Sequence, residues 1–211
     1  MSTTLKHSGA RATAVEIYRS EAYFLGVQRV LRRLPFAMID QAIDALWQAF
    51  VNRRTVFVFG NGGSAALASH SACDLGKGTV LNGGPRFRVL ALTDNVPLMT
   101  AWANDSDYSH IFSEQMIPFI EKDDVALAIS GSGNSPNVLN GLQTARDAGA
   151  VTIGLTGFQG GKLRSLCDVC VIVPSDNMQV IEDLHVSINH SIFLALRQRI
   201  CEMQDPLSQS Q

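Results

Sequence analysis

The sequence lacks an excess of positive charge: 17 lysines and arginines stand against 19 aspartates and glutamates, for a net charge of -2. Binding to a nucleic-acid backbone needs a basic surface, and no cluster of lysine and arginine stands out here. No run approaches the roughly 18 uninterrupted apolar residues of a membrane span, and the N-terminal residues do not follow the pattern of a secretory signal. We therefore expect a soluble, cytoplasmic protein with neither nucleic acid nor membrane as a partner.

Cysteine is also scarce. Of the four cysteines, Cys167 and Cys170 form a C-x-x-C pair. A structural zinc site built on such a pair needs a second pair, which the sequence does not contain, and a redox pair opens a helix, whereas this one runs into the apolar residues VCVIV. We expect these two cysteines to be core thiols in a reducing compartment.

Length and composition favour one domain, because 46 % apolar residues in a chain of 211 can bury a sizeable core and no low-complexity linker interrupts the sequence. The polar ends, residues 1–12 and 204–211, are expected to be flexible. Apolar side chains recur at helical spacing over residues 13–33 and 37–52, which predicts two leading helices. Trp47, Phe50 and the run AYFLG indicate burial, either within the chain or against a second copy.

Short runs rich in valine, isoleucine and leucine follow these helices. Each run is apolar on both faces, as in a parallel strand that is covered on two sides. The runs are residues 55–60, 87–93, 124–130, 150–156 and 168–174. Helical patterns fill most of the gaps, and a long helix spans residues 178–203. This order predicts a doubly wound three-layer α/β/α sandwich with a five-stranded parallel sheet, preceded by two helices.

Three of the predicted strands end in loops of small residues, GNGGSA, SGSGNS and TGFQGG. Ligands of such sheets bind at the carboxyl ends of the strands. GNGGSA matches the G-x-G-x-x-[GA] pattern of dinucleotide-binding proteins, but the acidic residue that should follow about 20 positions later is missing, since Asp94 lies farther along. No P-loop pattern occurs either. Dinucleotide and nucleoside triphosphate sites are therefore disfavoured.

The stretch SGSGNS brings three hydroxyl groups, those of Ser130, Ser132 and Ser135, to the start of a predicted helix. One serine would be enough to cap the helix. Two further hydroxyls beside the unpaired N–H groups of a helix N-terminus suit a phosphate monoester. We therefore favour a phosphate site over a simple helix cap.

Two helices carry polar side chains that could act together. His70 and Asp74 stand four residues apart and so share one helix face. The final helix offers Glu182, His185 and His190. A His/Asp pair at this spacing is more often an exposed contact than a metal site, but a second set on another helix favours a metal. His185 has two interpretations, a partner of Glu182 or a buried histidine.

These motifs together, with LTDN at residues 92–95 and LTGFQGGKL at 155–163, resemble the SIS (sugar isomerase) family and its phosphoheptose isomerase branch over nearly the whole chain. The resemblance implies that the three serines and the Gly131 backbone hold a sugar phosphate. It also implies a sugar pocket formed by Asn61, Gly62, Gly63, Ser64, Asp94 and Glu182.

The resemblance further implies a Zn²⁺ site formed by His70, Asp74, Glu182 and His190, with His190 and Asp74 moving the proton. Asp74 stands where the family has Glu and Glu182 where it has Gln; both types of side chain can ligate zinc. The implied reaction converts sedoheptulose 7-phosphate into D-glycero-D-manno-heptose 7-phosphate through an enediolate. The implied assembly is a homotetramer with its sites at subunit interfaces.

Two alternatives remain. One is a non-catalytic SIS protein that binds a sugar phosphate as an adaptor or regulator. The other is an isomerase for a different ketose phosphate, such as an octulose phosphate. All four candidate metal positions carry a side chain able to ligate, which favours an enzyme.

Overall fold

The computed structural model describes residues 19–81 and 83–204. The α-helices of this part are α1 (Ser20–Leu31), α2 (Phe36–Val51), α3 (Gly63–Cys73), α4 (Val96–Asp105), α5 (Ser113–Met116), α6 (Pro136–Asp147) and α7 (Met178–Gln204). The strands are β1 (Thr55–Gly60), β2 (Arg88–Ala91), β3 (Val125–Ser130), β4 (Val151–Thr156) and β5 (Val169–Ile172). Three short helical turns complete the fold: η1 (Asp74–Gly78), η2 (Tyr108–His110) and η3 (Lys162–Ser165).

The five strands form one parallel sheet in the order β2-β1-β3-β4-β5. Every residue of β1 and β3 is buried, as their apolar runs predicted. The predicted fold class is therefore confirmed. The strand order turns back between β1 and β3, and a ligand crevice is expected where the loops after these two strands part.

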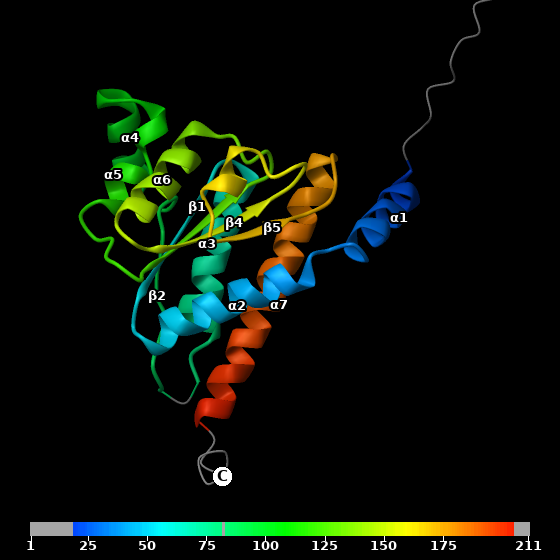
Figure 1. The fold of residues 1–211 in the computed structure, drawn as a ribbon, viewed down its shortest axis with the longest axis horizontal. Helices are drawn as coiled ribbons and strands as arrows, with labels where there is room; N and C mark the ends of the chain where they lie inside the picture. Colours follow the sequence, from blue (N-terminus) through cyan, green and yellow to red (C-terminus); the bar gives the residue numbers. More distant parts are fainter. Residues whose placement is uncertain (1–18, 82, 205–211) are drawn as a thin grey trace, which may run out of the picture.

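Helices cover both faces of the sheet. Val56 and Val58 of β1 join a core with α2, α3 and α7, whereas Phe57 and Phe59 point to the opposite core with α5 and α6. Figure 1 shows these two helical layers on either side of the strands. Each fully buried Val or Phe contributes about 1.5–3 kcal/mol of transfer free energy, so alternation along β1 stabilises both layers at once.

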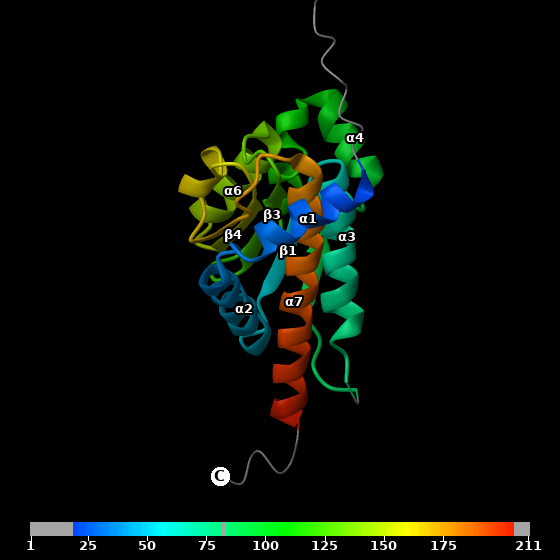
Figure 2. The same cartoon turned by 90° about the vertical axis from the view of Figure 1, so that its right-hand side faces the viewer.

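α3 and α7 lie side by side on one face (Figure 2). α7 turns a stripe of apolar residues to the core, including Leu184, Ile188 and Ile192. A Cβ atom built on Gly78 would come within 2.7 Å of the Phe193 ring, so the glycine lets the end of η1 approach α7 closely. This contact sets the spacing between the two helices.

The first helix is largely exposed. α1 contains no buried residue within the described structure, and Phe24 and Leu25 of the AYFLG run project into solvent. The Tyr23 hydroxyl donates a hydrogen bond to Asp183 of α7, and α1 lies beside α7 away from the sheet (Figure 1). By contrast, Phe50 is buried within the chain. Burial within the chain is thus observed for Phe50, whereas burial of the AYFLG run against a second copy stays a prediction.

Residues 13–18 of the first predicted helix lie outside the described residues. So do the ends predicted to be flexible, apart from Gln204, which closes α7. Cys167 and Cys170 are reduced, half buried and packed against the α6 side of the core, as expected for core thiols. In the part of the chain that the structure describes, no helix has the length and apolarity to cross a membrane.

Candidate functional site

The glycine loop (residues 60–65) joins β1 to α3 by a close turn. A Cβ on Gly60 would lie 2.5 Å from the Ile129 carbonyl oxygen of β3, and Gly62 has a φ of +56°, which favours glycine. Ser64 is buried, with its N–H bonded to the Asn61 carbonyl. The loop therefore presents backbone and small side chains at the carboxyl end of the sheet.

The serine loop (residues 130–135) leaves β3 and enters α6. The Gly133 N–H donates to both the carbonyl oxygen and Oγ of Ser130, at 3.0 and 3.2 Å, and Gly133 has a φ of +64°. A Cβ on Gly131 would lie 2.5 Å from Sδ of Met178, the first residue of α7. The loop is thus a tight turn packed under the start of the last helix.

The hydroxyl of the serine at the N-cap of α6 is not used to cap the helix. Ser135 occupies the N-cap position, but its side chain makes no capping hydrogen bond within the described residues. Ser132 Oγ accepts from the Asn134 N–H at 3.3 Å. The Ser135 hydroxyl therefore remains available to an anion at the start of α6, where Pro136 has no N–H and the Val138 N–H already donates to a side-chain oxygen at 3.0 Å.

The third loop (residues 156–161, TGFQGG) packs against the serine loop. The Gly157 N–H bonds to the Gly131 carbonyl and the Leu163 N–H to the Gly133 carbonyl, both at 2.9 Å. A Cβ on Gly133 would lie 2.2 Å from the carbonyl oxygen of Gly160. Backbone contacts from a neighbouring strand end therefore fix the serine loop.

A reciprocal amide pair connects the glycine loop with the serine-loop side. Asn61 Nδ2 donates to Asn137 Oδ1 at 2.9 Å, and Asn137 Nδ2 donates to Asn61 Oδ1 at 2.8 Å. The Tyr108 hydroxyl donates to the same Asn61 oxygen at 3.2 Å. Sequence analysis identified Asn61 but missed Asn137 and Tyr108, because no local pattern reveals a partner some 76 residues away.

Asp94 follows β2 and lies against α3. Its carboxylate accepts a hydrogen bond from Ser69, the residue before His70, and Ser69 Oγ is also 3.2 Å from Thr93 Oγ1. Asp94 is exposed, and its contacts link it to the middle of α3. The predicted sugar-pocket residue thus lies beside the helix that carries His70.

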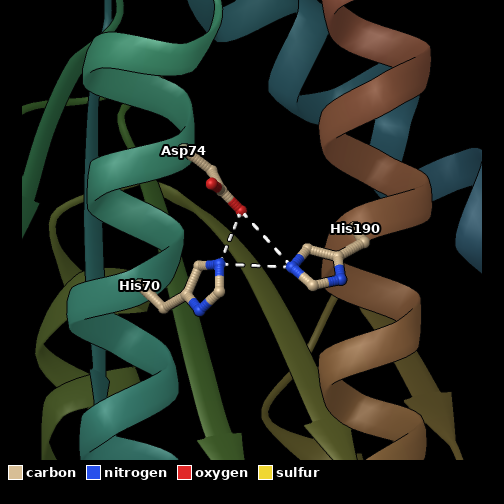
Figure 3. A group of neighbouring side chains, drawn as sticks. All are labelled: His70, Asp74 and His190. Carbon is tan, nitrogen blue, oxygen red and sulfur yellow. Dashed lines mark hydrogen bonds and ion pairs between the residues drawn. The ribbon is translucent and has the colours of Figure 1, made fainter.

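His70, Asp74 and His190 form one group, here called the histidine cluster. The two Nε2 atoms are 3.2 Å apart, and Asp74 Oδ2 lies 3.2 Å from Nε2 of His70 and 4.0 Å from Nε2 of His190. Figure 3 shows all three side chains turned into the space between α3 and α7. Both imidazoles are half exposed, while the carboxylate is more buried.

The histidine cluster fits a divalent metal such as zinc. Ligand atoms at about 2.0–2.2 Å from a tetrahedral Zn²⁺ lie about 3.3–3.6 Å from one another, and imidazole nitrogen and carboxylate oxygen are among its usual ligands. The three candidate atoms lie within 4.8 Å of one another. Asp74, although shorter than glutamate, reaches the cluster from the first residue of η1, a π-helical turn that continues α3.

Glu182 lies elsewhere, which corrects the predicted four-residue metal set. Among the described residues, the group able to share one ion consists of His70, Asp74 and His190. The Glu182 carboxylate instead lies beside Gly63, where a Cβ would meet Oε1 at 3.3 Å. Eight residues along a helix correspond to about 12 Å, so Glu182 is two turns from His190. With Gly63 and Ser64 it lines a cavity of about 230 Å³.

Of the two interpretations of His185, the structure supports the buried histidine. Its side chain is 1 % exposed, and Nε2 lies 3.1 Å from the Thr156 carbonyl oxygen. Nδ1 has no hydrogen-bond partner among the described residues. Burial lowers the pKa of His185 to about 4, against the opposing effect of the bond to Thr156. The ring is therefore neutral at pH 7 and donates through Nε2, joining α7 to the end of β4.

Comparisons with known proteins agree with this geometry. Residues 22–157 match the SIS domain family. A phosphoheptose isomerase of Aliarcobacter butzleri is 38 % identical over 172 residues, covering 80 % of this chain and 90 % of that protein. One from Rhodospirillum rubrum is 40 % identical over 146 residues, covering 69 % and 77 %.

Solved structures give the same result. The structure of phosphoheptose isomerase GmhA from Neisseria gonorrhoeae is similar with a TM-score of 0.79 and 29 % identity, over 84 % of this chain and 96 % of that one. A phosphoheptose isomerase from Francisella tularensis gives a TM-score of 0.78 and 32 % identity over the same shares.

Proposed function

The chain belongs to the SIS domain family, in its phosphoheptose isomerase branch, and we propose that it is an aldose-ketose isomerase acting on sedoheptulose 7-phosphate to give D-glycero-D-manno-heptose 7-phosphate. The observation that carries the proposal is that one chain holds both a serine loop shaped for a phosphate and an imidazole–carboxylate cluster suited to proton transfer. Neither feature alone would indicate isomerisation.

The serine loop binds the phosphate end of the substrate. Ser130, Ser132 and Ser135 supply hydroxyl groups, the Gly131 backbone allows close approach, and the positive end of the α6 dipole favours an anion. The glycine loop, with Asn61 and Ser64, lines the adjoining sugar pocket, and Asp94 and Glu182 complete it. Phosphate binding in this position contributes affinity that orients the carbonyl end for reaction.

The histidine cluster moves the proton. A base removes a proton from the carbon beside the carbonyl, and the electrons pass to the carbonyl oxygen to give an enediolate. The proton of the neighbouring hydroxyl moves to that oxygen, and the base returns its proton to the former carbonyl carbon as the hydroxyl oxygen becomes the new carbonyl. An imidazole suits this task near neutral pH, so His190 is assigned as the base and acid, with Asp74 beside it. A zinc ion held by His70, Asp74 and His190 would supply a Lewis acid for the developing oxyanion. Nε2 of His190 cannot bind the ion and a proton at once, so His190 would act as the base only when released from the ion.

The two halves of the site lie far apart within one chain. Met178 packs against Gly131 of the serine loop, and twelve residues of α7 separate Met178 from His190, about 18 Å of helix. We propose that a homotetramer brings the histidine cluster of one subunit to the serine loop of another. The half-exposed imidazoles and the exposed Phe24 and Leu25 of α1 support an assembly of this kind.

A direct test measures turnover and binding of ketose phosphates of five to eight carbons, with and without added Zn²⁺. We expect turnover of sedoheptulose 7-phosphate that falls on treatment with a chelator and returns with Zn²⁺. Binding without turnover of any of these sugars would favour the adaptor or regulatory alternative. A preference for the eight-carbon ketose phosphate would support an isomerase but change its proposed substrate.

A further inference from the structure

A buried polar residue of α7, Asn189, lies behind the histidine cluster. Asn189 is 7 % exposed, and its Nδ2 donates to Asp74 Oδ2 at 3.1 Å. On its other side, Oδ1 lies 2.6 Å from Oγ of Ser71, a fully buried residue of α3. The side chains therefore form a chain from Ser71 through Asn189 to Asp74.

The chemistry of these groups fixes the direction of the hydrogen bonds that link Ser71, Asn189 and Asp74. An ionised carboxylate can only accept hydrogen bonds, so the amide must turn its NH₂ toward Asp74 and its oxygen toward Ser71. The single proton of the Ser71 hydroxyl can be donated to that oxygen at 2.6 Å, which is shorter than the 2.8 Å to the competing Leu67 carbonyl. Each buried polar group thus has a partner, and the orientation of Asn189 is determined.

The carboxylate of Asp74 needs such a partner. Its Oδ2 atom faces His70, His190 and Asn189 together, at 3.2, 4.0 and 3.1 Å. The side chain is still one-fifth exposed, so without Asn189 it could rotate toward water. Hydrogen-bond partners that orient a ligating carboxylate typically change metal affinity or activity 10–100-fold when removed.

We propose that Asn189 is a positioning residue that holds the Asp74 carboxylate toward the two imidazoles, and that Ser71 fixes the amide of Asn189. The affinity of the histidine cluster for a divalent cation then depends on two residues that never touch the ion. This inference rests on the metal-binding part of the proposed function. A purely structural Asn189, one that only ties α3 to α7, would affect stability but leave metal affinity unchanged.

The test compares Zn²⁺ and Co²⁺ affinity of the purified full chain by chelator competition, together with the melting temperature of the metal-free protein. Asn189→Leu keeps the shape of the side chain, removes both amide hydrogen bonds and leaves Ser71 its bond to Leu67. We expect metal affinity to fall about 10–100-fold. Unchanged affinity in a folded Asn189→Leu protein would overturn the proposal.

A second variant keeps the test decisive if Asn189→Leu does not fold. Ser71→Ala leaves the bond from Asn189 to Asp74 in place, so a smaller loss of affinity is expected, and the double variant should be no worse than Asn189→Leu alone. Additive losses would show that Ser71 does not act through Asn189. Ser191→Ala serves as the matched control, because the bond of its hydroxyl within the described residues is to the Ile188 carbonyl of the same helix.

These outcomes are separable from failure of the proposed function. Wild-type protein that binds Zn²⁺ without isomerising any sugar would remove the isomerase and leave the positioning role intact. Wild-type protein that binds neither metal would overturn the positioning role together with the metal-binding part of the proposed function, and turnover would still decide the isomerase. Wild-type protein that binds and isomerises, with Asn189→Leu and Ser71→Ala unchanged in affinity, would remove the positioning role alone.

Discussion

The serine loop and the histidine cluster are built in opposite ways. The loop is a turn whose shape is set by backbone hydrogen bonds from the third loop and by glycines that admit close neighbours. The histidine cluster consists of side chains in the middle of two helices, half exposed and oriented by a single buried amide. The phosphate end of the proposed site is thus preorganised within the chain, while the proposed reactive end depends on side-chain rotamers and, in our proposal, on a metal and a second subunit.

The largest expected effect distinguishes the two regions by the kinetic constant that each one controls, kcat for the histidine cluster and KM for the serine loop. His190→Ala should lower kcat about 10²–10⁴-fold with little change in phosphate binding, because it removes a proton-transfer group. Ser135→Asp should instead raise KM at least about 10-fold, because its charge repels the phosphate, while aspartate remains a good N-cap for α6. Steady-state kinetics and competition by inorganic phosphate measure both. A histidine variant with undiminished kcat would contradict the assignment of His190.

The second prediction tests whether the two regions of one site come from different subunits. His190→Ala and Ser135→Asp proteins, assayed at a substrate concentration well below the KM of Ser135→Asp so that each has little turnover alone, should gain activity when unfolded together and reassembled. Each shared site draws its two halves independently, so about a quarter of the sites become intact. Each variant refolded alone is the control. Mixed assemblies without recovered turnover would show that each site is complete within one subunit.

The third prediction concerns His185, which joins the helix of the cluster to the strand end near the loops. Burial holds the folded-state pKa of His185 near 4, below the ordinary value of 6.5. Between these values the unfolded chain binds more protons than the folded one, so stability falls as pH drops from about 6.5 toward 4. From pH 7 to pH 5 this loss is about 2 kcal/mol.

Urea unfolding at pH 5, 6 and 7 and constant salt measures the effect. His185→Gln keeps a donor for the Thr156 carbonyl and cannot titrate, so its stability should vary less with pH by that amount. His110→Gln, which replaces a partly buried histidine on η2, should retain the wild-type slope. Equal slopes in all three proteins would exclude His185 as the acid-sensitive group.

The two regions also differ in how far the sequence predicts them. The parallel sheet follows from five apolar runs, and the serine loop is one contiguous motif at the end of such a run. The pairing of His70 with Asp74 needed only helical spacing. These features are local, so periodicity and turn chemistry are sufficient to find them.

The remaining features depend on distances between helices. Glu182 and His190 differ by about 80° around the helix, which permits one shared face. They are nevertheless separated by about 12 Å along the helix axis. Asn189 was missed because it precedes a more conspicuous histidine and bonds to a residue 115 positions away. Asn137 was missed for the same reason. These contacts arise because α3 packs against α7 and the two loops pack against each other. The spacing of residues along the sequence does not reveal such contacts.

The smallest expected effect tests the link between the glycine loop and the serine-loop side. Asn137→Asp keeps an oxygen for Asn61 and for the Val138 N–H but removes the donor to Asn61 Oδ1, leaving two oxygens in contact. A lost hydrogen bond of this kind costs about 1–1.5 kcal/mol, so KM should rise about 5–10-fold with kcat less affected. Asn140→Asp is the matched control, because the bond of its amide in the part of the chain that the structure describes is to the Ser109 carbonyl. If both variants raise KM equally, α6 as a whole is sensitive to charge and the amide pair does not align the two loops.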